Sequence, residues 1–329
     1  MAEQLRWGIL ATGSIARQFA RGLAVSRTGT LHAVGSRSLA TAEGFAREHG
    51  GRGYASYQAV LDDPSVEAVY IALPHHMHEE WTIKAAQAGK GILCEKPFTL
   101  NSLEATTGIS VVREQGVFFM EAFMYRCHPQ TQKLVELVRG GAIGKLLNIN
   151  LEFGFAAGED WDNFRADGAL GGGGLMDVGT YCVSMARLLA GEEPDRLSYT
   201  ADLTRGYDAQ GSGCLHFPSE VTAHFACGIH AQLRNDVRVY GTEGWISVDQ
   251  PWKCREGAIH LQRNGEDAHT FEITSTNDEL YALEADAVAR FWEAKECPYM
   301  TVEDTLGQMR ALDALRESAG LVFAAERRP

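Results

Sequence analysis

The feature that most constrains this chain is the alternation of short apolar runs with longer amphipathic segments over roughly its first 120 residues. Strands are expected at residues 5–10, 31–36, 68–73, 91–94 and 117–120, and helices at 14–25, 39–48, 78–88 and 102–114. Nearly continuous apolar strands that alternate with helices predict a parallel sheet covered on both faces. Because such crossovers have a fixed handedness, we expect a doubly wound α/β (Rossmann) domain over residues 1–125.

The pattern changes after about residue 125. A helix at 130–139 and a strand at 146–155 lead to a glycine cluster at 168–174 and a helix at 176–189. Polar and apolar residues then alternate at 219–229, 236–240, 245–249 and 258–262, and helices are expected at 281–295 and 302–323. Alternation with period two predicts a large, mostly antiparallel open sheet with one covered face. Residues 126–329 are therefore expected to form an α+β domain for substrate binding and oligomerisation, with C-terminal helices that return toward the first domain.

Composition excludes several classes of protein. The 329 residues suit about two domains, and a formal net charge of −13 disfavours nucleic-acid and membrane-surface partners. The longest apolar runs are far shorter than a membrane helix needs, and the N-terminus lacks the apolar core of a signal peptide. Seven cysteines with no Cys-x-x-Cys pair indicate reduced thiols. We expect a cytoplasmic protein.

A glycine-containing loop follows the first strand and opens the first helix. The cofactor-binding candidates in it are Thr12, Gly13, Ser14 and Ile15. Gly13 allows the backbone to approach a pyrophosphate, and the helix N-terminus offers free amides to phosphate. Ala11 departs from the Gly-x-Gly-x-x-Gly/Ala pattern at its first position. The loop therefore predicts a dinucleotide site, although a simple tight turn would also explain it.

The end of the second strand indicates which dinucleotide is bound. NAD-binding folds place an acidic residue there for the ribose hydroxyls, whereas this chain has Ser36, Arg37 and Ser38. Two hydroxyls and a guanidinium suit the additional phosphate of NADP. NADP is favoured over NAD, and the alternative is that Arg37 is a solvated surface charge.

Further candidates follow the third and fourth strands, where doubly wound sheets place their ligands. Cofactor-binding residues are expected in two groups, Leu73, Pro74, His75 and His78 after one strand, and Glu95 and Lys96 after the next. The three histidines at 75, 76 and 78 do not have the spacing of a zinc site, so no metal is expected.

These motifs together resemble the glucose–fructose oxidoreductase/inositol dehydrogenase (Gfo/Idh/MocA) family. The resemblance spans essentially the whole chain and is carried by the loop at 11–16, Pro74 to His78, Glu95-Lys96-Pro97 and the glycine-rich segment 172–181. Residues 120–126 with His128-Pro129 are most similar to the branch of NADP-dependent xylose dehydrogenase, trans-dihydrodiol dehydrogenase and 1,5-anhydrofructose reductase. The resemblance implies hydride transfer at a sugar-like carbon and pairing of subunits through the open sheet.

The resemblance also implies the catalytic residues. Lys96 matches the family's catalytic lysine, and Asp177 and Tyr181 match the paired positions of its second signature, where many members carry histidine in place of Tyr181. Asp177 and Tyr181 lie four residues apart on a predicted helix and would share a face. The hypothesis is that Tyr181 exchanges the hydroxyl proton, Lys96 holds the substrate oxygen and lowers the tyrosine pKa, and Asp177 orients a neighbouring hydroxyl. The alternatives are a helix-terminus carboxylate and a core tyrosine.

Substrate contacts are expected from polar and aromatic residues outside these motifs. The candidates are Tyr125, Arg126, Trp161 and Arg165, together with Asp177, and each of the first four could instead serve packing. The function predicted is an NADP(H)-dependent oxidoreductase acting on the CH–OH group of a cyclic sugar or sugar-like polyol or ketone. Alternatives are a dehydrogenase of trans-dihydrodiols and a non-catalytic NADP-binding redox sensor. A homodimer or a dimer of dimers is expected.

Overall fold

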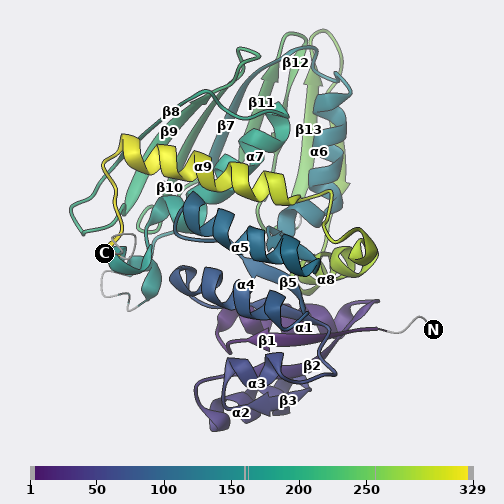
Figure 1. Cartoon of the computed structure of the whole chain (residues 1–329). Helices are drawn as coiled ribbons and strands as arrows, with labels where there is room; N and C mark the ends of the chain where they lie inside the picture. The colour runs from purple at the N-terminus through teal and green to yellow at the C-terminus, as the bar shows by residue number, and fades with distance from the viewer. Residues whose placement is uncertain (1–3, 159–160, 162, 256, 325–329) are drawn as a thin grey trace. The chain divides into compact units, whose positions relative to one another are not determined.

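The computed structural model describes residues 4–158, 161, 163–255 and 257–324, and the chain divides into two compact units (Figure 1). Unit 1 contains residues 1–127 and 276–306, and unit 2 contains residues 128–275 and 307–329. Residues 276–306 therefore join the N-terminal part of the chain, more than 140 residues away in sequence. Among the described residues, no helix is both long and apolar enough to cross a membrane.

Unit 1 is a doubly wound domain. Its described strands form a parallel sheet in the order β3-β2-β1-β4-β5-β6, in which β1 and β4 are neighbours. The strands are β1 (Leu5–Leu10), β2 (Gly29–Gly35), β3 (Arg52–Tyr54), β4 (Ala68–Ile71), β5 (Gly91–Glu95) and β6 (Phe119–Ala122). Every residue of β4, β5 and β6 is buried, as a sheet covered on both faces requires.

Helices complete unit 1. They are α1 (Ser14–Val25), α2 (Leu39–His49), α3 (Tyr57–Leu61), α4 (His78–Gln87), α5 (Ser102–Gln115), α8 (Asn277–Arg290) and the first residues of α9 (Val302–Ser318). Phe19 of α1 stacks on Tyr70 of β4, with ring centroids 4.0 Å apart, and meets Trp7 of β1 edge-on. α1 also packs closely on α8, because a Cβ added to Gly22 would lie 2.6 Å from the Cβ of Tyr281. The returning helix is thus part of the core of unit 1.

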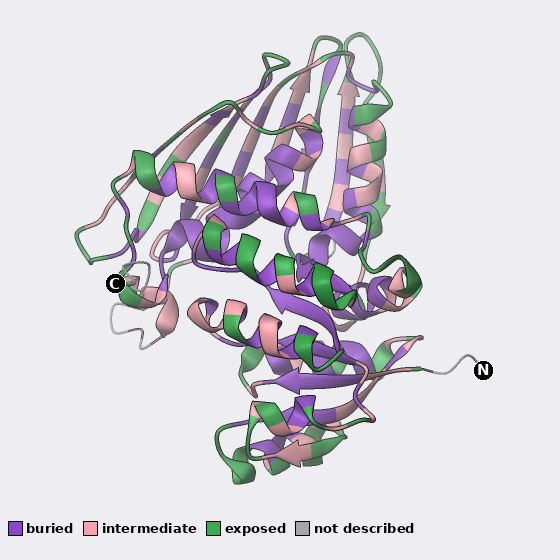
Figure 2. Cartoon of the chain, in the orientation of Figure 1, coloured by how far each residue is buried: buried purple, intermediate pink, exposed green. Residues whose placement is uncertain are grey.

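Unit 2 is built on a large sheet. Its described strands have the order β14-β13-β12-β11-β7-β10-β9-β8, and among the pairs only β7 with β10 is parallel. The strands are β7 (Leu146–Gly154), β8 (Arg196–Ala201), β9 (Gln210–His216), β10 (Thr222–Gly228), β11 (Val237–Gly241), β12 (Gly244–Val248), β13 (Gly257–Arg263) and β14 (His269–Ile273). Helix α7 (Thr180–Ala190) packs on β7 and β10, and α6 (Pro129–Arg139) packs on β13. Figure 2 shows buried residues alternating with more exposed ones along these strands.

The predicted fold class is confirmed, and several local predictions need correction. The short elements β3, α3, β8, β9 and β14 were not predicted from the sequence. The helix predicted at 176–189 begins instead as a π-helical turn, Leu175–Gly179, and becomes α-helical only at Thr180. Hydrogen bonds in a π-turn run from i to i+5, so spacings of four residues in it do not follow the α-helical register.

Candidate active site

In unit 1, the predicted cofactor residues lie at one edge of the sheet. Leu10 pairs with Gly35 of β2 and with Ile71 of β4, and Ile71 pairs with Cys94 of β5. Because these strands are parallel, the segments that follow them all leave the sheet at its carboxyl edge. The loops that carry Thr12, Ser36, Leu73 and Lys96 therefore belong to one edge of the sheet, at the point where the strand order changes direction. Doubly wound sheets place their ligands at this point.

The first loop has the properties of a phosphate cradle. Gly13 is the N-cap of α1, makes no side-chain capping bond, and has open space where a Cβ would stand. Ser14 and Ile15 form the first turn of α1, and Thr12 precedes it. Ala11 has a φ of 114°, a conformation that suits the glycine found there in the usual pattern. The backbone therefore keeps the dinucleotide loop geometry although the residue differs.

The second strand leads to an exposed cation. Arg37 is exposed, and no carboxylate in the described part of the chain pairs with its guanidinium. Ser36 is buried and its Oγ accepts from the Ser38 amide at 3.4 Å, while Ser38 caps α2 through a bond from Thr41 N–H at 3.5 Å. An unpaired guanidinium beside a helix N-terminus fits a phosphomonoester. The donor set present here therefore fits NADP.

His78 connects the two loops that follow β4 and β5. Its Nε2 lies 2.7 Å from the carbonyl oxygen of Leu73, and its Nδ1 lies 3.0 Å from that of Pro97 and 3.2 Å from that of Phe98. Burial lowers the pKa of His78 to about 4. The imidazole is thus neutral and fully buried, and both of its nitrogens face backbone carbonyl oxygens. These contacts favour a role in positioning the two loops over direct contact with the cofactor. His75 is also buried, and Pro74 is half-buried.

Two buried carboxyl groups hold the segment that carries Lys96. Glu95 accepts a short hydrogen bond from the Tyr70 hydroxyl, and Glu121 of β6 accepts from the Phe98 N–H at 2.9 Å. Burial raises the pKa of Glu121 to about 8. Lys96 itself is buried and precedes a cis peptide bond to Pro97. Glu121 was not predicted from the sequence, because its partner lies 23 residues away.

Glu284 of α8 is a further buried acid that sequence reasoning missed. Neither of its carboxyl oxygens has a hydrogen-bond partner among the described residues. Burial first, and then the nearby Glu95 carboxylate, raise the pKa of Glu284 well above its usual range.

In unit 2, Asp177 is held by an arginine. The Nε of Arg165 donates to Asp177 Oδ1 at 2.8 Å, and Asn163 accepts from the Arg165 amide at 3.1 Å. Asp177 lies in the π-helical turn and is 5% exposed, whereas the Arg165 side chain is 25% exposed. Two residues that the sequence analysis proposed for the site are therefore brought together, and the guanidinium of Arg165 orients the Asp177 carboxyl group.

Tyr181 lies in the first turn of α7 among aromatic rings. Phe153 meets it edge-on at 5.2 Å between centroids, and Trp252 approaches it at 6.0 Å and 67°. Trp252 stacks on Phe153 at 5.5 Å and donates from its indole to the carbonyl of Glu152 at 2.8 Å. These rings orient the phenol from an apolar side. Phe153 and Trp252 were not predicted, since nothing in their local sequence marks them.

The remaining substrate candidates have structural partners. Arg126, in unit 1, is 1% exposed, pairs with Asp304 at 2.6 Å and donates to the Tyr299 carbonyl at 3.3 Å. Tyr125 is fully buried, and in unit 2 Trp161 meets Phe155 edge-on at 5.6 Å. These contacts favour the packing alternative for Arg126 and Tyr125, and a substrate role for any of the three stays a prediction.

Both parts of the chain match family models of one group of enzymes. Residues 5–123 match the model of an oxidoreductase family with an NAD-binding Rossmann fold, and residues 131–247 match the GFO/IDH/MocA C-terminal domain. The chain belongs to the GFO/IDH/MocA family of oxidoreductases.

Individual relatives cover nearly the whole chain. It is 34% identical to D-xylose 1-dehydrogenase (NADP(+)) 2 of Haloferax volcanii, over 98% of this chain and 99% of that protein. It is 31% identical to trans-1,2-dihydrobenzene-1,2-diol dehydrogenase of Mus musculus, over 98% and 99%. The solved structure of KijD10, a 3-ketoreductase from Actinomadura kijaniata in complex with NADP and TDP-benzene, superposes with a TM-score of 0.86 at 27% identity, covering 96% of this chain and 98% of that one.

Proposed function

We propose that this protein is an NADP(H)-dependent oxidoreductase that interconverts an alcohol and a carbonyl on a cyclic sugar or a sugar-like polyol or ketone. The observation that carries the proposal is the similarity to an NADP-dependent xylose dehydrogenase over 98% of the chain. The exposed Arg37 after β2, with no acidic residue in that segment, supports NADP over NAD. NADP, when bound, supplies the hydride acceptor for oxidation and the donor for reduction.

The proposed chemistry assigns one task to each of three residues. Oxidation removes a hydride from the carbinol carbon and a proton from its hydroxyl, and Tyr181 takes that proton. Lys96 holds the same oxygen and stabilises the phenolate electrostatically. Asp177, oriented by Arg165, accepts a hydrogen bond from a neighbouring substrate hydroxyl. The proposal requires that the three residues act on one substrate.

Two variants, each of which removes the hydroxyl group of one tyrosine, test the proton transfer. Tyr181→Phe should lower kcat with D-xylose and NADP by at least about 100-fold, because a positioned acid–base group contributes that much or more. Tyr240→Phe removes the same hydroxyl from β11 of the same unit and should keep wild-type kcat. Binding of NADPH, followed by its fluorescence, should stay unchanged in both variants. Wild-type kcat in Tyr181→Phe removes Tyr181 from the mechanism.

A second pair of variants tests the cofactor. Arg37→Gln should raise the KM for NADP by roughly 10- to 100-fold, the worth of a charge-assisted hydrogen bond, and leave the KM for NAD nearly unchanged. Arg47→Gln makes the same change of charge near the far end of α2, where the side chain is also exposed. It should leave both KM values unchanged. An equal effect of the two variants would show that only general surface charge matters.

One relative favours a second substrate class. The 31% identity to a trans-dihydrodiol dehydrogenase extends over 98% of the chain, which supports a non-sugar diol as the alternative substrate. Initial rates on D-xylose, other aldoses, sugar ketones and trans-1,2-dihydrobenzene-1,2-diol, with NADP and NAD in parallel, decide between the classes. No oxidation or reduction with any of them would instead favour a redox sensor.

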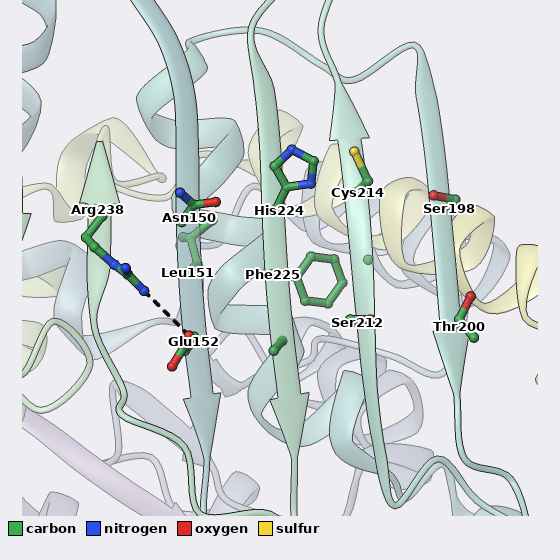
Figure 3. A pocket seen from close by; sticks show the side chains of 12 residues that line it. Asn150, Leu151, Glu152, Ser198, Thr200, Ser212, Cys214, His224, Phe225 and Arg238 are labelled. Atoms are coloured by element: carbon green, nitrogen blue, oxygen red, sulfur yellow. Dashed lines mark ion pairs between the residues drawn. The ribbon is translucent and has the colours of Figure 1, made fainter. Parts of the chain in front are cut away.

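We also propose that a second copy of the chain covers the open face of the unit 2 sheet. Figure 3 shows the polar side chains on this face, which come from five neighbouring strands. They include Asn150 and Glu152 of β7 and His224 of β10, and Arg238 of β11 pairs with Glu152 at 3.6 Å. Light scattering should give at least twice the chain mass of 36.0 kDa, and a value near 36.0 kDa would refute the dimer.

A further inference from the structure

The carboxyl group of Asp208 lies behind the glycine-rich segment of unit 2. Asp208 is fully buried in the turn before β9. Its Oδ2 accepts from the Leu175 N–H at 2.6 Å, and its backbone carbonyl accepts from the Gly174 N–H at 2.7 Å. The side chain and the main chain of Asp208 therefore both hold the backbone at Gly174 and Leu175, three and two residues before Asp177.

The Asp208 carboxyl group also explains why position 173 is a glycine. Gly173 has a φ of +127°, and a Cβ added to it would lie 1.7 Å from Asp208 Oδ1. Its carbonyl accepts the Asp177 N–H at 3.0 Å. The backbone at Gly173 thus passes directly against the carboxylate and also leads into the turn that carries Asp177. Any side chain at position 173 would push the backbone away from the Asp208 carboxyl group.

Two further buried residues, Tyr199 and Cys227, connect Asp208 to the other end of the π-helical turn. The Tyr199 hydroxyl donates to Asp208 Oδ2 at 2.8 Å and lies 3.3 Å from Cys227 Sγ. A Cβ added to Gly179 would lie 2.9 Å from the same sulfur. Tyr199 in turn stacks on Phe225, with centroids 5.8 Å apart. One connected set of buried groups therefore touches both the start of the turn and its end, next to Tyr181.

We propose that Asp208 is a positioning residue for the reaction, which sets the backbone of the π-helical turn and thereby the side chains of Asp177 and Tyr181. This inference rests on the proposed function, because it needs those two residues to be the catalytic ones. Asp208 has no direct contact with the reacting atoms. Its effect is on the fraction of molecules in which Asp177 and Tyr181 have the reactive geometry.

Asp208→Asn tests this proposal, because Oδ2 alone accepts from both the Leu175 N–H and the Tyr199 hydroxyl. An amide of the same size must put its NH2 group either against those two donors or against Gly173, where Oδ1 now lies. Its kcat with D-xylose and NADP should fall by roughly 10-fold or more, since small displacements of catalytic groups have effects of that size. The KM for NADP, which depends on unit 1, should stay within about twofold. Wild-type kcat in folded Asp208→Asn would overturn the proposal.

A combined variant separates positioning from general weakening of the fold. If Asp208 acts through Asp177 and Tyr181, adding Asp208→Asn to the variant Asp177→Asn/Tyr181→Phe should leave the kcat of that variant unchanged within about threefold. A further fall in kcat as large as the one that Asp208→Asn causes in the wild type would overturn the proposal. A lowered kcat in Asp208→Asn together with a wild-type kcat in Tyr181→Phe would instead refute the proposed function.

Gly173 offers a second route if Asp208→Asn does not fold. Gly173→Ala should lower kcat by roughly 10-fold or more, because the methyl displaces the backbone from Asp208. Gly191→Ala is the matched control, since Gly191 ends α7 at a φ of +73° with open space around its added Cβ. It should lose some stability and keep kcat. Equal kcat in the two glycine variants, measured per folded enzyme, would overturn the proposal.

Discussion

Ala11 gives the sharpest test of the backbone argument at the cofactor edge. It occupies the first position of the dinucleotide loop with a φ of 114°, where glycine would be free of strain. A side chain at positive φ costs about 1–2 kcal/mol, and the extra freedom of glycine in the unfolded chain costs about 0.5–1 kcal/mol. Ala11→Gly should therefore raise the free energy of unfolding by ~0.5–1 kcal/mol. The melting temperature should rise by roughly 1–3 °C.

Ala16→Gly is the matched control for this prediction. It makes the same change five residues later, at a fully buried position inside α1. There glycine loses about 1 kcal/mol of helix propensity and about 0.8 kcal/mol from the buried methyl group, so the control should be destabilised. Urea and thermal unfolding of both variants measure the difference. A loss of stability in Ala11→Gly as large as in Ala16→Gly would refute the assignment of strain to Ala11.

Three further predictions concern unit 1. The pKa of His78 is lowered from 6.5 to about 4, so the unfolded state binds the proton first, and stability should fall as pH drops from 6.5 to 4 by about 3 kcal/mol. His78→Gln should flatten that dependence in urea titrations. The pKa of Glu121 is raised from 4.5 to about 8, so the folded state keeps a proton that the unfolded state releases, and stability should fall as pH rises through that range. Glu121→Gln should therefore be more stable than the wild type at pH 8, and a less stable variant there would contradict the prediction. Gly22→Ala should cost roughly 1–3 kcal/mol in thermal unfolding, because the new methyl meets the backbone of Tyr281 at 2.9 Å.

The sequence determined the doubly wound architecture of unit 1 almost completely. β1 (Leu5–Leu10) and α1 (Ser14–Val25) have the predicted bounds, because apolar periodicity and the glycine loop are local properties of the chain. Strands β8 and β9 of unit 2 were harder to predict. β9 contains Gly211 and Gly213, and Cβ atoms added there would meet the rings of Tyr199 and Phe225. A strand whose small residues make room for neighbouring rings lacks the pattern that prediction needs.

The candidate site residues could also be proposed from local motifs, whereas the residues that contact them could not. Asp177 and Tyr181 lie in one glycine-rich segment, but Arg165 pairs with Asp177 across 12 residues and Asp208 holds Leu175 across 33. Trp252 reaches Tyr181 from 71 positions along the chain. Hydrogen bonds and ring contacts of this kind depend on which strands become neighbours in the sheet. Tertiary structure alone therefore decided that the segment starts as a π-turn, and which buried groups orient its side chains.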